Sequence, residues 1–120
     1  MKILTICLTV ALTLVYSGKS FSEVGLKKGT VEHIRIHDTN HVGWEPPLFW
    51  FTLNGVTKAG NCSAWQGNVL FVADSDQMLT MILTAQMGKQ EIAVHYNDLI
   101  KTNGYCRATF ITTGNPPPIT

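Results

Sequence analysis

Residues 74–88 read Asp-Ser-Asp-Gln-Met-Leu-Thr-Met-Ile-Leu-Thr-Ala-Gln-Met-Gly and decide the fold. The first three residues are good helix N-caps, and their acidic side chains suit the helix dipole. The residues after them are strong helix formers, and Gly88 is typical of a C-terminal cap in the left-handed conformation. The sequence therefore predicts one helix over 77–87. Its inward stripe would hold Met78, Leu79, Ile82, Leu83 and Ala85, with Met81 at the edge.

The segments on either side of this helix have the hydrophobic pattern of short β-strands. Three strands are predicted before it and two after it, at residues 30–38, 48–53, 69–73, 90–96 and 105–113. Residues 56–68 are predicted as a long loop with room for a short strand, and residues 97–104 as a loop that turns at Asn103-Gly104. A single helix between the third and fourth of five strands is the layout of an OB-fold. We therefore expect a mainly β, five-stranded Greek-key barrel, although a generic α+β sandwich has the same element order.

The N-terminal residues have the pattern of a signal peptide. A basic start, Met1-Lys2, precedes an apolar run over 3–16 that is shorter than the roughly 20 residues needed to span a bilayer. Ser20-Phe21-Ser22 places small residues at the two positions that a signal peptidase inspects. We expect residues 1–22 to be removed. Cleavage after Ser17 and a retained membrane anchor are the alternatives.

The mature protein would then work outside a bacterial cytoplasm, either in the periplasm or as a secreted protein. We expect a folded domain over residues 23–114 and a stiff, solvated, proline-rich tail over 115–120, with no membrane span. Lys2 and Lys19 leave with the signal peptide, so seven basic and eight acidic side chains remain. This balance disfavours nucleic acid as a partner, because proteins that neutralise phosphates need a basic face.

Cysteine usage agrees with an oxidising compartment. Cys7 lies in the predicted signal peptide and lacks the small residues that precede a lipidated cysteine. Cys62 and Cys106 remain as an even pair, and we expect one disulfide between them. Neither cysteine is flanked by further zinc ligands, and the pair lacks the Cys-x-x-Cys spacing of a reactive dithiol.

Three short passages are similar to the B subunits of AB-type bacterial toxins, the subtilase-cytotoxin kind in particular. They are the glycine-framed lead at 25–31, the triplet Asn61-Cys62-Ser63, and the passage through the helix end and fourth strand at 87–96. The resemblance implies an OB-fold, a homopentamer with its helices around a central pore, and binding of cell-surface glycans. The chain departs from the sialic-acid-binding members at Lys28, where they carry a hydroxyl residue, so no sugar-binding residue carries over.

Trp44 and Trp65 are the candidate ligand-binding residues. Both lie in predicted loops, where aromatic rings can stack on sugars or bases. The alternative is that each ring covers one end of a small barrel and fills volume that the core needs. Trp50 lies in a strand that is apolar on both faces, which indicates a core position or a subunit interface.

Catalysis and metal binding find little support. His33 and His37 share a strand face but lie about 13 Å apart at roughly 3.3 Å per residue, too far to bind one zinc ion together. With His41 they are interpreted as solvated, and His95 as an outward strand residue. The chain has no Gly-x-Ser-x-Gly elbow and no phosphate-binding glycine loop. No catalytic residue, metal site or cofactor is predicted.

We therefore expect an exported binding module, not an enzyme, that recognises a cell-surface glycan or a protein partner. One alternative is a periplasmic structural or interaction protein that binds no sugar. The other is a small metal-dependent or hydrolytic protein.

Overall fold

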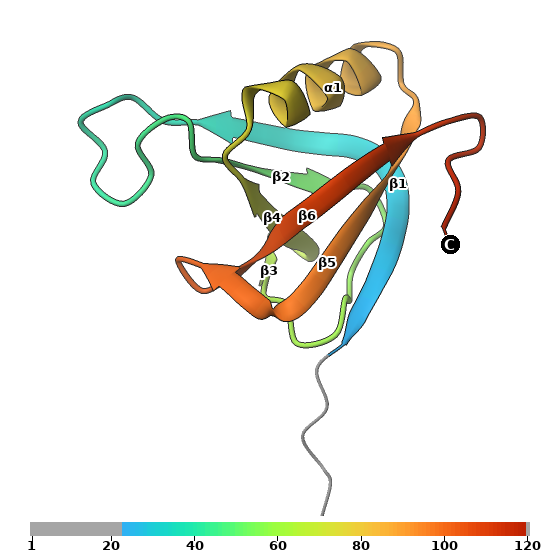
Figure 1. The fold of residues 1–120 in the computed structure, drawn as a ribbon, viewed down its shortest axis with the longest axis horizontal. Helices are drawn as coiled ribbons and strands as arrows, with labels where there is room; N and C mark the ends of the chain where they lie inside the picture. The colour runs from blue at the N-terminus through green and yellow to red at the C-terminus, as the bar shows by residue number, and fades with distance from the viewer. Residues whose placement is uncertain (1–22, 120) are drawn as a thin grey trace, which may run out of the picture.

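The computed structural model describes residues 23–119, and its strands surround a core that one helix covers (Figure 1). The elements are β1 (Val24–Ile36), β2 (Phe49–Leu53), β3 (Ala64–Trp65), β4 (Asn68–Ala73), α1 (Asp76–Met87), β5 (Glu91–Thr102) and β6 (Tyr105–Thr113). The predicted signal peptide, residues 1–22, lies outside the described residues. Among the described residues, no helix has the length and apolar character needed to cross a membrane.

Five strands close a barrel through a continuous ring of backbone pairings. β1 pairs antiparallel with β2 and β5, β2 pairs with β4, and β5 pairs with β6, while β4 and β6 are parallel neighbours. The ring runs β1-β2-β4-β6-β5 and returns to β1, and the short β3 lies on the edge of β4. The helix separates the third and fourth barrel strands. The structure thus confirms the expected OB-fold-like barrel.

β1 begins earlier than predicted because it pairs first with β5 and then with β2. Residues 24–30 pair with β5 and residues 31–36 pair with β2, so the strand curves around the barrel (Figure 1). Gly29 lies just before the change of partner. A Cβ there would lie 2.8 Å from the Asn54 carbonyl oxygen and 3.3 Å from the Leu53 Cβ. This close approach requires glycine. Because glycine has no side chain, it weakens the alternation of apolar and polar residues by which a strand is predicted.

α1 begins one residue earlier than predicted and covers one end of the barrel (Figure 1). The Ser75 hydroxyl accepts a hydrogen bond from the Met78 N–H and caps the helix. Leu83 is 38% exposed, whereas the rest of the predicted stripe packs on the core through Met78, Leu79, Ile82 and Ala85. Gly88 is the C-cap, as predicted, but the left-handed conformation expected for it is wrong. Gly88 has φ −84° and extends the helical hydrogen bonding, so the positive φ falls on Lys89.

β5 and β6 form a long hairpin beside the disulfide. β6 has its predicted bounds, but β5 continues to Thr102 through residues predicted as loop. Asn103 and Gly104 form the predicted turn, with φ of 55° and 84°. Cys62 and Cys106 are joined, as predicted, so the loop before β3 is tied to β6.

Candidate functional site

The outer surface of β1, β2, β4 and β6 carries four side chains in one row. Arg35 pairs with Trp50, Trp50 with Val72, and Val72 with Arg107. Because directly paired residues point to the same side of a sheet, a cation lies at each end of an apolar strip. Trp50 and Val72 are buried, but they belong to a cluster separate from the barrel interior.

Aromatic side chains from outside the barrel cover this strip. The buried members of the cluster are Trp50, Leu70 and Val72, and the half-buried side chains packed on them are Trp44, Leu48, Trp65 and Tyr105. The ring centroids of Trp50 and Trp65 are 4.8 Å apart, and those of Trp44 and Tyr105 are 6.4 Å apart. We call the surface formed by Trp44, Trp50, Trp65 and Tyr105 the aromatic face. The two predicted candidates, Trp44 and Trp65, therefore belong to one surface.

Arg35 adds a cation to the aromatic face. Its guanidinium carbon lies 4.9 Å from the centre of the Trp50 ring and 5.4 Å from that of Trp65, within the range of cation–π contacts. Arg35 is exposed, and no ion pair found among residues 23–119 includes it. Arg107, by contrast, places Nη2 2.7 Å from Asp74 Oδ1. The Arg35 guanidinium is therefore the better placed of the two to bind a ligand.

A polar rim borders Trp65 where β1 bulges. The register of β1 against β2 shifts just before His33. Glu32 Oε1 accepts hydrogen bonds from Asn68 Nδ2 at 2.9 Å and from Thr52 Oγ1 at 3.3 Å. The His33 ring meets Trp65 edge-on, with 5.7 Å between centroids. An apolar surface with a few oriented polar groups at its edge is the usual composition of a small-ligand site.

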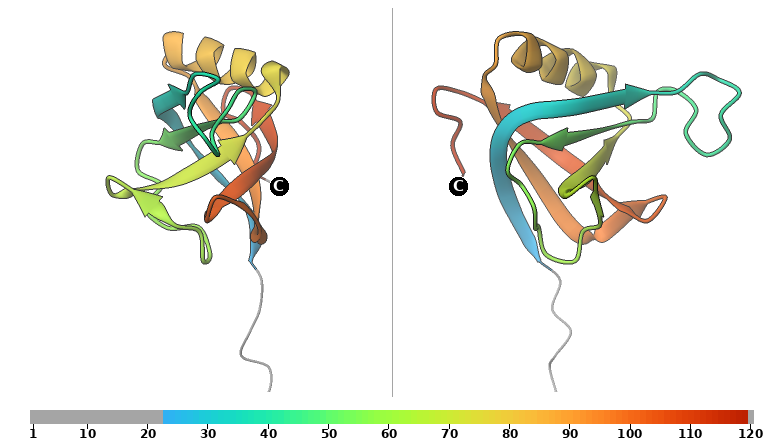
Figure 2. Two further views of the ribbon diagram at one scale, coloured as in Figure 1. Left: turned by 90° about the vertical axis from the view of Figure 1, so that its left-hand side faces the viewer. Right: turned by 180° about the vertical axis from the view of Figure 1, so that it is seen from behind.

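Two loops frame the aromatic face. The loop at 37–48 supplies Trp44, the β5–β6 turn leads into Tyr105, and both project from the same side of the barrel (Figure 2). The Asn103 side-chain amide donates a hydrogen bond to the Gly43 carbonyl oxygen at 2.7 Å, which joins the two loops. In OB-folds the second and third barrel strands and these two loops form the common surface for oligosaccharides and oligonucleotides. The aromatic face occupies that surface.

His37 and His41 meet where the loop at 37–48 leaves β1. Their ring centroids are 4.4 Å apart, and the His37 ring lies 5.5 Å from Trp44. Burial lowers the pKa of His37, and the nearby His41 and Arg35 lower it further. The neutral imidazole is therefore favoured. Within residues 23–119, no group of three or more His, Cys, Asp or Glu side chains is placed to hold a metal ion.

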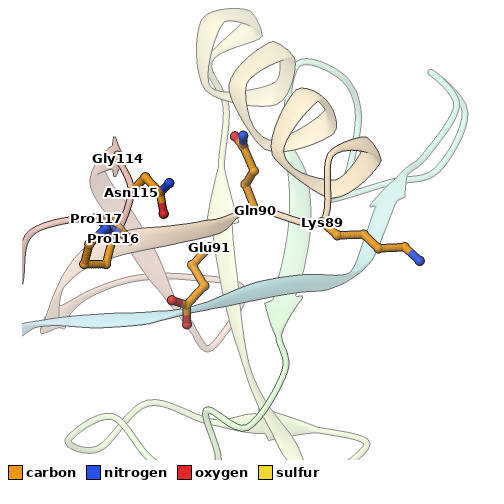
Figure 3. Close-up of a pocket in the computed structure, with 7 residues that line it drawn as sticks. All are labelled: Lys89, Gln90, Glu91, Gly114, Asn115, Pro116 and Pro117. Carbon is orange, nitrogen blue, oxygen red and sulfur yellow. The ribbon is translucent and has the colours of Figure 1, made fainter.

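A cavity of about 240 Å³ lies away from the aromatic face, beside the proline-rich tail. Lys89, Gln90 and Glu91 line it together with residues 114–117. The charged ends of Lys89 and Glu91 point apart (Figure 3), so the cavity gathers no convergent charged groups. Pro117 is buried here, which means that the tail is not the fully solvated end expected from the sequence.

Arg35 and Tyr105 belong to this site, although they are not among the candidates that the sequence predicts. Trp50 is 4% exposed, as a core position requires, but it is buried outside the barrel. The signal that could have found Arg35 is strand alternation, which places it on the polar face of its predicted strand. Alternation does not give the register, and only the register sets Arg35 opposite Trp50.

Comparisons with protein-family models, with curated proteins and with solved structures find no match to this chain. The aromatic face is therefore the feature of the molecule from which a function can be inferred.

Proposed function

We propose that the protein is an exported binding module whose aromatic face recognises a carbohydrate. The observation that carries this proposal is the exposed Arg35 guanidinium over Trp50 and Trp65, on the strand surface that two loops frame. Aromatic rings offer apolar faces to the C–H side of a sugar ring, and oriented polar groups satisfy its hydroxyls. The carboxylate of Glu32 and the amide of Asn68 supply such polar groups beside Trp65.

Single-stranded nucleic acid could stack on the same rings, but charge disfavours it. Binding to phosphates requires a groove lined by cations. The chain would carry seven basic and eight acidic side chains once residues 1–22 are removed. In addition, one cation of the row, Arg107, is already paired with Asp74.

Two further observations support action outside the cytoplasm. The Cys62–Cys106 disulfide is of the kind that persists in oxidising compartments. Residues 1–22 have the pattern of a secretory leader.

The resemblance to toxin B subunits adds a homopentamer to the proposal, in which five aromatic faces would raise avidity for a glycan-coated surface. Light scattering of the purified protein tests the pentamer, and a monomer mass contradicts it.

A protein partner is the second candidate for the same surface. The observation that favours it is Val42, which is 88% exposed in the loop that carries Trp44. Aromatic and arginine side chains are enriched in protein interfaces, and the Val42 side chain would become buried with them on binding.

A glycan array distinguishes the two candidates. The probes are the labelled, disulfide-intact protein, its Trp65→Ala variant and its Phe110→Ala variant. Phe110 is 45% exposed and stacks on His95, so it offers a matched aromatic control outside the aromatic face. We expect the wild type and Phe110→Ala to bind one class of sugar and Trp65→Ala to lose it. A blank array from folded wild-type protein overturns the carbohydrate proposal and favours the protein partner.

A further inference from the structure

Asp98 on β5 is a buried carboxylate with no cation in direct contact. It is 3% exposed, and no ion pair found among residues 23–119 includes it. Its two oxygens accept backbone N–H bonds, Oδ1 from Glu23 at 2.9 Å and Oδ2 from Asn61 at 3.0 Å. These N–H groups, that of Asn61 first, lower the pKa of Asp98 against the effect of burial, and the charge of Lys101 lowers it further. Buried charges in proteins are ordinarily paired, so this carboxylate lacks an expected partner.

Glu23 is held in place by three hydrogen bonds, two with Asp98 and one with Tyr96. Its N–H donates to Asp98, its carbonyl oxygen accepts the Asp98 N–H at 3.0 Å, and its side chain accepts a hydrogen bond from the Tyr96 hydroxyl. Gly60 closes the site, because a Cβ there would lie 2.6 Å from Asp98 Oδ2 and 2.8 Å from the Glu23 Cβ. The fold therefore fixes the position of the Glu23 nitrogen beside the carboxylate.

The carboxyl groups of Glu23 and Asp98 both act on the hydroxyl of Tyr96. Burial raises the pKa of Tyr96, and the hydrogen bond to Glu23 and the charges of Glu23 and Asp98 raise it further. Lys101 lies nearby, but its ammonium donates to the Asn61 carbonyl oxygen at 3.3 Å. A cation placed at the Glu23 nitrogen would balance the buried negative charge.

The sequence independently marks the bond before Glu23 as a cleavage site, since Ser20-Phe21-Ser22 precedes it. We propose that cleavage after Ser22 turns the Glu23 nitrogen into an α-ammonium group that forms an ion pair with the buried carboxylate of Asp98, so that removal of the leader completes the fold. This inference rests on the export that the proposed function includes. A signal-peptidase-type protease hydrolyses the Ser22–Glu23 bond. Water supplies the hydroxyl of the new Ser22 carboxyl group and a proton to the Glu23 amine.

At neutral pH the new amine takes up a further proton from solvent and becomes an ammonium group, because α-amino groups have an ordinary pKa near 8. A neighbouring carboxylate favours that charged form further. An extension of one residue before Glu23 would leave a neutral amide at the same place. The ion pair therefore predicts that the stability of the domain depends on the presence of a free amine at Glu23.

The test compares four disulfide-intact proteins. Two begin at Glu23 or at one added glycine before it, and the other two carry Asp98→Asn in addition. We expect the added glycine to lower Tm by roughly 4–8 °C. In the Asp98→Asn background it should change Tm by no more than about 1 °C, because the two changes act on one contact. If the added glycine leaves Tm unchanged in the protein with Asp98, or lowers Tm by the same amount in the Asp98→Asn background, the ion pair is overturned.

A second measurement stands if Asp98→Asn does not fold. The rate of α-amine acetylation by acetic anhydride should be at least about tenfold lower in the protein that begins at Glu23 than in the glycine-extended one, because the carboxylate of Asp98 holds the paired amine in its unreactive, protonated form. Equal rates overturn the ion pair. N-terminal sequencing of the exported full chain tests the premise. A first residue other than Glu23 overturns the inference, whereas a Glu23 start with equal Tm values overturns the ion pair and leaves export intact.

Discussion

Arg35 and Trp50 are cross-strand partners in β1 and β2, and the guanidinium carbon of the arginine lies 4.9 Å from the centre of the indole ring. Trp65 approaches the same guanidinium from β3, at 5.4 Å. Trp50 is 4% exposed, so it forms the buried base of the contact, while the half-buried Trp65 presents the outer ring. Removal of each of these three side chains should therefore have a different effect.

Arg35→Ala should lower the free energy of unfolding by about 0.5–1 kcal/mol, because it removes a cation–π contact at an exposed position. Urea denaturation measures the change. Lys58→Ala is the control, since Lys58 is exposed in a loop and should alter stability by no more than about 0.5 kcal/mol. An equal effect of the two substitutions would show that the contact with Trp50 contributes nothing.

Trp50→Ala should lower the free energy of unfolding by about 3–5 kcal/mol, the usual cost when a buried aromatic side chain is truncated. Trp65→Ala should cost less, because its ring is half-buried and leaves a smaller void. The same urea series measures both. This order makes Trp65 the residue with which to test binding, and a greater loss of stability in Trp65→Ala would contradict it.

Loss of the disulfide should lower the free energy of unfolding by about 4 kcal/mol in the chain-entropy model, because the bond closes a loop with a sequence separation of 44. The double variant Cys62→Ala/Cys106→Ala avoids a free thiol. Calorimetry with and without a reducing agent measures the effect. A reductant should lower the Tm of the wild type and leave that of the double variant unchanged.

The stability of the protein should fall as the pH drops below about 6.5, in part because of His37. Burial, with His41 and Arg35 nearby, lowers the pKa of His37 in the folded state, while Asp38 acts in the opposite direction. The unfolded chain therefore binds the proton first, and stability is lost as the pH falls from 6.5 towards the folded-state pKa. His37→Asn should flatten a plot of unfolding free energy against pH in this window. A slope that the substitution leaves unchanged would exclude His37 as a source.

The elements that local sequence defines were predicted well. The Ser75 cap, the Asn103-Gly104 turn and the bounds of β6 follow from residues close together in the chain. Residues 24–29 of β1 and the second half of β5 were missed because they lack clear alternation and are extended by pairing with distant strands. Gly88 is the C-cap, as predicted, but the positive φ expected at Gly88 falls one residue later, at Lys89.

The candidate site was predicted only in part, for a similar reason. The sequence predicts Trp44 and Trp65 as candidate ligand-binding residues in loops, and the structure places both in the aromatic face. The contact of Arg35 with Trp50 depends on the register of β1 against β2 and on the bulge before His33. Register and bulges are set by tertiary packing, so a single sequence does not reveal them.

The most direct test of the central claim is the dissociation constant of the array-selected glycan for wild type, Trp65→Ala and Phe110→Ala, measured by titration calorimetry. If the aromatic face binds the glycan, Trp65→Ala should bind it at least about tenfold more weakly, which is about 1.4 kcal/mol, and Phe110→Ala should bind it as the wild type does. Equal affinity in all three proteins, or the absence of any bound glycan, would contradict carbohydrate recognition by the aromatic face.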